Sequence, residues 1–422
     1  MPEMNRPVRS KRLPYVVVAV LVVIGLALAL VALRLSGYRR EATRLSNRLD
    51  GELRALEQAA PARRWSPKPL RGASHEGNGA ELQFALAGRF TIPEGLFSTE
   101  ATVGCPSAEQ RTFLDAHRAE LDELRHIATV QSAQTRLDLQ AGHEVPLPAY
   151  GPVLRAHRAL RARAQLEPAR GCFEQAADSV RLAQQLVPGG SVIGAVFSAR
   201  SLGEGAELAA RCIGGATPAE LNDAASELSR LGDDAPSLAN GDGIEQEYLA
   251  RAATMRKSLQ IEALIPFSAD ERESVTQGGL VLEAWRWSLD QLPEARAIGE
   301  AGYPMAADRW RALSQAERAS SNSLIALSSA VEAAMGADRT AQAKLRVVAA
   351  LLHQLAVDAK AGSPQALAGA SFPDPFRLAS ISLARDGDGK LRAWSVGPDT
   401  ADQSGQGDDI SLTGAAAGDR CR

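Results

Sequence analysis

A stretch of 21 uncharged residues, Leu13 to Leu33, lies close to the start of the chain. At ~1.5 Å per residue, a helix of this length matches the ~30 Å hydrocarbon core of a bilayer. The apolar core of a cleaved signal peptide is shorter, ~7–15 residues, and ends at small residues. This stretch instead runs into Arg34, Leu35 and Ser36. The sequence therefore predicts an uncleaved transmembrane anchor over 13–34, after a basic N-terminal tail over 1–12.

Basic residues flank the anchor on both sides, so their number does not decide its orientation. Long domains cross the membrane largely regardless of flanking charge, while a short basic tail usually stays in the cytoplasm. We therefore expect a single-pass protein of the inner membrane with an extracytoplasmic (periplasmic) body; the opposite orientation is the alternative. The basic residues are Arg6, Arg9, Lys11 and Arg12 before the anchor and Arg34, Arg39, Arg40, Arg44 and Arg48 after it.

The composition favours helices and argues against one class of partner. Ala, Leu and Arg are frequent, whereas aromatic residues make up only 5% of the chain. The net charge of −3 argues against nucleic-acid binding through a basic surface. The chain beyond the anchor is long enough for two or three domains.

Two segments separate the anchor from the main body. Over 35–60, a polar helix is predicted, and its leucines recur at spacings of 4, 4 and 3 as one apolar stripe: Leu45, Leu49, Leu53 and Leu56. Gly51 interrupts this run, which favours a simple juxtamembrane helix over a coiled-coil stalk. Proline and glycine are frequent over 61–104, which predicts a linker of irregular structure.

Helix signals follow at short intervals over 105–336. Ser107 with Gln110, and Thr217 with Glu220, have the spacing of N-terminal caps. Because the connections are short, we expect an all-α domain of antiparallel helical hairpins. No fixed repeat period is present, so no tetratricopeptide array is predicted. The helices are expected over about 107–130, 151–167, 171–187, 191–213, 217–231, 243–260, 277–291, 306–316 and 318–335.

The four cysteines are Cys105, Cys172, Cys212 and Cys421. No two of them have the CxxC spacing, which argues against a zinc site or a redox dithiol. In an oxidising compartment they allow up to two disulfides in three connectivities. Cys172 and Cys212 fit equally well as buried thiols within helices.

The pattern changes after Pro364, and we expect a small α+β module over 337–412, followed by a disordered tail over 413–422. A helix over 338–359 precedes two strands, over 378–383 and 391–396. The acidic turn between them, Asp386 to Gly389, is not an EF-hand, because the twelfth residue counted from Asp386 is Gly397 rather than Glu. A hairpin turn is therefore favoured there.

This module resembles the C-terminal part of the major pseudopilin of type II secretion. The features that carry the resemblance are the helix over 338–359, the turn Asp374-Pro375-Phe376, the strand end Trp394-Ser395-Val396-Gly397 and the acidic, glycine-rich loop from Pro398 to Asp409. The resemblance implies that calcium binds in this loop, through Asp399, Asp408 and Asp409, with Ser395 near them. Oxygen ligands on a loop suit calcium; a solvated loop rich in Gly and Asp is the alternative.

The resemblance does not extend to the N-terminus. Residues 1–40 lack the prepilin-peptidase site and the glutamate that follows it in pseudopilins, and a helical domain separates anchor from module. We therefore expect a borrowed module rather than a pilus subunit. The segments 70–79 and 178–194, together with the tail, resemble a group of single-pass bacterial envelope proteins, a likeness that implies no activity.

Motifs of known catalytic centres are missing from the sequence. It contains no G-x-S-x-G, no H-E-x-x-H and no Walker loop, and its six histidines are scattered. Glu245 and Glu247, beside Tyr248, open a predicted helix, where carboxylates favour the helix dipole. Another predicted helix is basic. We expect its arginines to form a solvated face, and a patch that binds anionic lipid or an acidic partner is the alternative. These arginines are Arg155, Arg158, Arg161 and Arg163.

These observations favour a membrane-tethered extracytoplasmic interaction or scaffold protein without catalytic activity. Its expected partners are the membrane, through the single helix, and a protein of the envelope. The alternative is an envelope hydrolase whose acidic site forms only in three dimensions.

Overall fold

The computed structural model describes residues 13–59, 65–66, 68, 75–98, 104–135, 137–144, 147–188, 191–236, 243–262, 271–301, 305–322, 324–325, 329–367, 372–377, 379–413 and 421. The expected basic tail over 1–12 and most of the expected C-terminal tail lie outside these residues. Within them the fold is mainly helical with one small sheet, which confirms the predicted fold class at that level.

The helices are α1 (Leu13–Ala59), α2 (Gly79–Arg89), α3 (Ala108–Ala116), α4 (Arg118–Ala128), the 3-10 helix η1 (Leu139–Glu144), α5 (Tyr150–Ala164), α6 (Ala169–Gln184), α7 (Val192–Arg211), α8 (Pro218–Asp233), α9 (Gly243–Glu262), α10 (Glu271–Asp290), α11 (Leu292–Glu300), α12 (Met305–Ala319) and α13 (Ser329–Ala361). The strands are β1 (Ser382–Arg385), β2 (Leu391–Ser395) and β3 (Ile410–Thr413). Both predicted caps form: Ser107 with Gln110 and Thr217 with Glu220 each make a reciprocal capping box.

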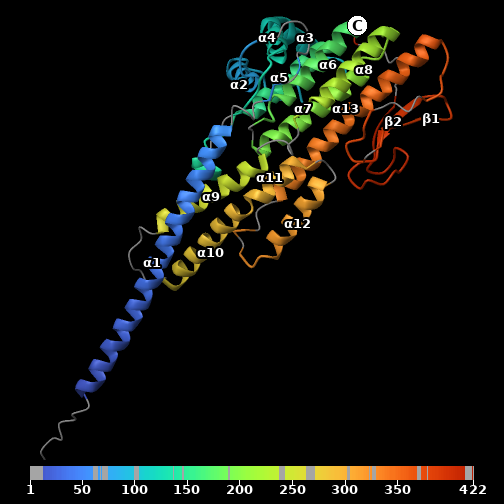
Figure 1. Ribbon diagram of the computed structural model, residues 1–422. Helices are drawn as coiled ribbons and strands as arrows, with labels where there is room; N and C mark the ends of the chain where they lie inside the picture. The colour runs from blue at the N-terminus through green and yellow to red at the C-terminus, as the bar shows by residue number, and fades with distance from the viewer. Residues whose placement is uncertain are drawn as a thin grey trace, which may run out of the picture.

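Helix α1 runs without a break from the apolar stretch into the body (Figure 1). Among the described residues it is the one helix long and apolar enough to cross a membrane. The large side chains of its first half are exposed, for example Val23 and Leu33, each at 66%. Gly51 does not interrupt the helix, because the leucines on either side of it are buried against the body.

The leucine stripe of α1 belongs to the core of the body. Leu45, Leu49 and Leu53 are buried in one cluster with residues of α9 and α10, and Leu56 packs against that cluster. The segment expected as a juxtamembrane helix is thus a packed element of the fold, not a free stalk. Tyr38 also packs on this core, so contact with the body begins shortly after the apolar stretch ends.

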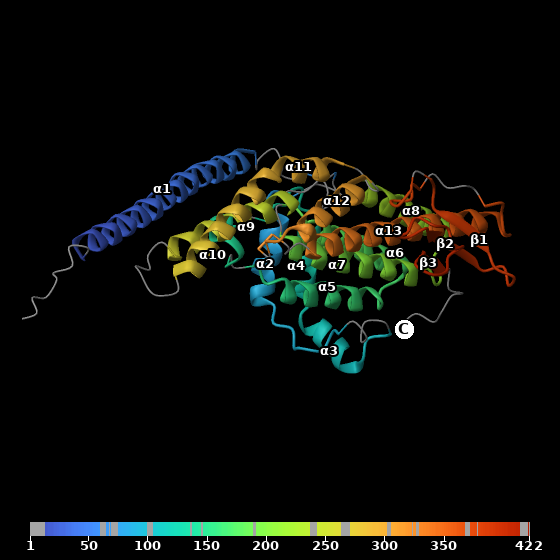
Figure 2. The ribbon, with the colours of Figure 1, turned by 90° about the horizontal axis from the view of Figure 1, so that it is seen from below.

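Helix α13 joins the two halves of the body. Its first turns belong to the same apolar cluster as α1, α9 and α10 and contact α12, and its later turns pack against α7 and α8. The sequence predicted two helices here, over 318–335 and 338–359, with a domain boundary at 336–337. The structure instead has one helix through Gly336, because α13 is buried along both halves. Figure 2 shows α13 running lengthwise through the body, with α3 on one side and α11 on the other.

Several elements differ from the predicted ones. Helix α2 lies within the segment expected as an irregular linker; Gln83, Leu86 and Ala87 bury its inner face, so tertiary packing outweighs its terminal glycines. The helix expected over 107–130 is divided into α3 and α4 at His117, whose ring packs against Phe90 and Phe113. Helix α11 was not predicted.

The sheet has the order β1-β2-β3, with both pairs antiparallel, and packs on α13. The predicted hairpin turn is confirmed: Oδ1 of Asp386 accepts hydrogen bonds from the backbone of Asp388 and Lys390. The first strand begins later than predicted, and β3, which follows the acidic loop, was not predicted.

All four cysteines form disulfides, Cys105–Cys421 and Cys172–Cys212. The first joins the end of the chain to the loop before α3. The second joins the first turn of α6 to the end of α7. Of the two readings left open for Cys172 and Cys212, the disulfide is therefore the observed one.

Candidate functional site

A groove lies between α6 and α8, at the end of the body away from the start of α1 (Figure 1). It encloses about 400 Å³, within the usual range for sites that hold a ligand or a few side chains. Its floor is apolar and buried, and consists of Phe173, Ala177, Ala224 and Leu228. The outer row of α8 supplies three carboxylates, Glu220, Asp223 and Glu227, and α6 supplies Arg170 and Glu174.

Two of the carboxylates at the groove are held in ion pairs. Glu174 lies 3.3 Å from Arg170 and 3.5 Å from Arg125. Glu227 lies 2.8 Å from Arg230 on the same helix. These partly exposed pairs fix the side chains in place more than they contribute stability.

The other two carboxylates have different roles. Glu220 closes the capping box of α8 and accepts a hydrogen bond from the backbone of Thr217 at 2.8 Å. Within the described part of the chain, Asp223 is exposed and forms no ion pair. The Cys172–Cys212 disulfide lies one residue before Phe173 of the floor and five before Thr217, so it holds the chain near the starts of both helices that line the groove.

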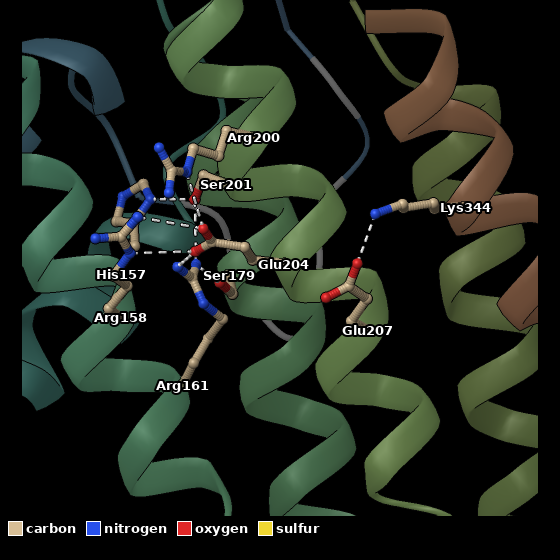
Figure 3. Close-up of polar contacts among 9 residues, drawn as sticks. All are labelled: His157, Arg158, Arg161, Ser179, Arg200, Ser201, Glu204, Glu207 and Lys344. Carbon is tan, nitrogen blue, oxygen red and sulfur yellow. Dashed lines mark hydrogen bonds and ion pairs between the residues drawn. The ribbon is translucent and has the colours of Figure 1, made fainter. Parts of the chain in front are cut away.

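A buried polar network joins α5, α6 and α7 (Figure 3), and Gln83 extends it to α2. Nδ1 of the fully buried His157 lies 2.7 Å from Oγ of Ser201, and its Nε2 lies 2.8 Å from Oε1 of Gln83. Because the amide oxygen of Gln83 only accepts, Nε2 carries the proton and Ser201 donates to Nδ1. Burial, and then the charge of Arg161, lower the pKa of His157 to about 3, so the imidazole is neutral.

The one carboxylate of this network belongs to Glu204 and is surrounded by three arginines. Glu204 of α7 pairs with Arg161, with Arg158 at 3.3 Å and with Arg200 at 3.2 Å. Burial alone would raise the pKa of Glu204, but Arg161 and Arg158 bring it below its usual value. Burial lowers the pKa of Arg161 to about 10, against the raising effect of Glu204. Every charge here has a partner, which is what a buried structural network requires.

This network corrects the interpretation of the basic helix. Arg158 and Arg161 of α5 are mostly buried and pair with Glu204, and Arg163 pairs with Asp122 at 2.7 Å. They therefore form neither a solvated face nor an open patch for an anionic surface. The sequence alone could not pair α5 with α7, because the residues concerned lie about forty positions apart.

A second buried cluster surrounds Tyr248. Its hydroxyl donates to Oε1 of Glu317 at 2.9 Å, and Arg251 donates to the same oxygen at 3.2 Å. Burial raises the pKa of Glu317, although Arg251 opposes this. Glu247 pairs with Arg251, and Glu245 accepts from Arg296 at 2.6 Å. Of the two acids beside Tyr248, Glu247 is therefore paired within its own helix, and Glu245 joins α9 to α11.

The residues expected to bind calcium share one loop, but its carboxylates accept hydrogen bonds from the loop itself. Oδ1 of Asp399 accepts from the backbone of Ala401, Oδ2 of Asp408 accepts from the backbone of Asp399, and Oδ2 of Asp409 accepts from Gln403 and Gly405. Across the described ranges, no group of three His, Cys, Asp or Glu side chains is arranged to hold a metal ion.

Ser395 lies opposite Ile410, the residue after Asp409, in the β2–β3 pair, so it is near this loop as expected, but its hydroxyl is engaged elsewhere. Its hydroxyl donates to Oδ1 of the buried Asp374 at 2.8 Å, and Val396 donates its backbone N–H to Oδ2 at 3.1 Å. Asp374 thereby joins the turn before the sheet to the end of β2.

The acidic row on α8 is a feature of this candidate site that the sequence interpretation missed. Glu220, Asp223 and Glu227 recur at three and four residues, so they lie along one side of the helix, and no basic residue lies between them. Comparison of the chain with protein-family models, with curated proteins and with solved structures found no match.

Proposed function

We propose that this protein is a single-pass, membrane-tethered extracytoplasmic scaffold that holds a partner protein at a fixed position above the membrane. The observation that carries the proposal is the continuity of α1. Its first half exposes large apolar side chains, and its second half buries Leu45, Leu49 and Leu53 in the core of the body.

The exposed first half of α1 supports anchorage. In water, a row of exposed Val and Leu side chains would be unfavourable, whereas in a bilayer it would be solvated by lipid. Since no flexible segment separates this half from the body, the anchor would set the height and orientation of the body, and not merely limit its diffusion.

The disulfides support an extracytoplasmic body. All four cysteines are paired, and disulfides persist mainly in oxidising compartments such as the periplasm. With the basic tail over 1–12 in the cytoplasm, the groove between α6 and α8 would lie on the membrane-distal side.

Partner capture tests the proposal. The full chain, tagged and cross-linked in cells, should recover the same envelope protein in independent preparations and in several detergents. Recovery of no reproducible protein would contradict a scaffold role.

An envelope hydrolase is the second candidate, and one observation favours it: four carboxylates, Glu174, Glu220, Asp223 and Glu227, line the same groove. Such an enzyme needs one carboxyl group that acts as an acid and another that acts as a base. If purified full chain degrades cell-wall preparations and Asp223→Asn abolishes this, the hydrolase is supported. Equal background rates for both proteins would dismiss it.

Calcium binding by Asp399, Asp408 and Asp409 stays a prediction from the pseudopilin resemblance. Its ligands would have to give up the loop hydrogen bonds that they now accept. Calcium should then raise the melting temperature of the full chain, and Asp408→Asn should remove this effect. An equal melting temperature in calcium and in chelator would contradict the prediction.

A further inference from the structure

We propose that the groove between α6 and α8 binds a basic amphipathic segment of the partner protein, inserting an apolar side chain between the helices while lysines or arginines face α8. This inference rests on the proposed function, and names the chemistry of the partner and the surface that receives it.

The charge of the groove selects a cationic occupant. Along α8, Glu220, Asp223 and Glu227 form a continuous acidic row, and Asp223 is exposed without an ion pair in the described ranges. Arg170, the single basic residue of the lining, is already paired with Glu174. A basic segment would pair with the exposed carboxylate of Asp223, whereas an acidic one would be repelled by it.

The apolar floor and the small volume of the groove favour insertion of one or two apolar side chains of the partner. Phe173, Ala177, Ala224 and Leu228 offer no hydrogen-bonding side chain. About 400 Å³ of space holds one or two large side chains and is too small to enclose a helix. The occupant would therefore lie along the groove and insert only its anchoring residue, as in helix-in-groove recognition.

The groove is preorganised for such binding. The capping box and Pro218 fix the start of α8, and the Cys172–Cys212 disulfide fixes the start of α6. Little backbone freedom would be lost on binding, so more of the contact energy would appear as affinity.

Binding of a synthetic peptide tests the inference. The full chain is placed in phosphatidylcholine nanodiscs and titrated into a fluorescent helical peptide with leucines on one face and lysines on the other; empty nanodiscs serve as the blank. Two groove variants are compared, Asp223→Lys, which reverses the exposed charge, and Ala224→Leu, which fills the floor. Glu57→Lys, an equal charge change on the exposed surface of α1, is the matched control.

We expect saturable binding to the natural chain and to Glu57→Lys, and about tenfold weaker binding to each groove variant. Circular dichroism of each variant checks that the helices are retained; if one groove variant is unfolded, the other decides. Equal affinity of the control and a folded groove variant would overturn the inference, as would no binding above the blank. If the partner captured in cells is retained by Asp223→Lys, the groove assignment fails while the scaffold function stands.

Discussion

Arg48 of α1 lies 2.5 Å from Asp290 at the end of α10, and a second nitrogen of its guanidinium donates to the carbonyl of Leu289 at 2.7 Å. Three further ion pairs join the same helix to the body: Glu41 with Arg286 at 3.0 Å, Asp50 with Arg256 at 2.7 Å and Glu52 with Arg296 at 2.6 Å. The helix that carries the apolar stretch is thus bound to the body through both polar and apolar contacts. Tilting of this helix in a membrane would move the body with it.

Removing a buried leucine of α1 should destabilise the whole body. Leu49 is fully buried, so Leu49→Ala should lower the free energy of unfolding by about 2–5 kcal/mol, the usual cost of such a cavity. Urea unfolding of the full chain in detergent measures this. Leu35→Ala, on the exposed part of the same helix, is the control, with an expected change within about 0.5 kcal/mol. Equal effects of the two changes would show that α1 does not belong to the core.

The neutral His157 should make the protein sensitive to acid. An unfolded histidine takes up a proton near pH 6.5, but the folded one does so only near pH 3, so its contribution to stability is lost as pH falls between these values. At pH 4.5 the loss relative to neutral pH should be about 2–3 kcal/mol, two pKa units at 1.36 kcal/mol each.

His157→Gln provides the comparison, because glutamine does not titrate. Its unfolding free energy should fall less steeply from pH 6.5 to 4.5 than that of the natural chain, whatever its stability at neutral pH. Parallel pH profiles for the two proteins would mean that His157 is not held neutral in the folded state.

Loss of the Cys172–Cys212 disulfide should weaken the distal half of the body. The bond closes a loop of 40 residues, for which the chain-entropy relation gives about 4 kcal/mol. The double variant Cys172→Ala with Cys212→Ala should lose a large part of this in urea unfolding. Thiol titration of the natural protein, purified without reductant, should find no free thiol. Four free thiols would contradict both disulfides.

Asp374 should be essential for docking the sheet. Its carboxylate accepts hydrogen bonds from Ser395 and from the backbone of Phe376 and Val396, and all of these lie in buried surroundings. Asp374→Ala should cost about 2–4 kcal/mol, because several buried donors lose their acceptor. Asp388→Ala, in the exposed hairpin turn, should change stability little. Faster amide exchange in β2 of the Asp374 variant would locate the damage; unchanged exchange would refute the role.

Local signals in the sequence predicted local structure well. The capping boxes of Ser107 and Thr217 and the hairpin turn at Asp386 depend on residues a few positions apart, and each is found where it was predicted. The leucine stripe of α1 was also recognised from its spacing. Its burial was not, because the surface that covers it comes from α9 and α10, some two hundred residues later.

The features that were missed depend on long-range contacts. Helix α13 continues through Gly336 because neighbours on both sides bury it, which a local helix-breaking signal does not reveal. β3 is only four residues long and exists because it pairs with β2 across the acidic loop. Likewise, the role of Glu204 depends on the contact of α7 with α5, which its local sequence does not indicate. The groove depends in the same way on the contact of α8 with α6.

The central claim, a membrane-tethered body on the extracytoplasmic side, is tested most directly by thiol labelling. Full-length protein in spheroplasts is treated with a membrane-impermeant maleimide, with and without prior reduction. We predict labelling of unbroken spheroplasts only after reduction, because the disulfides would be accessible from outside but closed. Free thiols that label only once the inner membrane is broken would place the body in the cytoplasm and contradict the account.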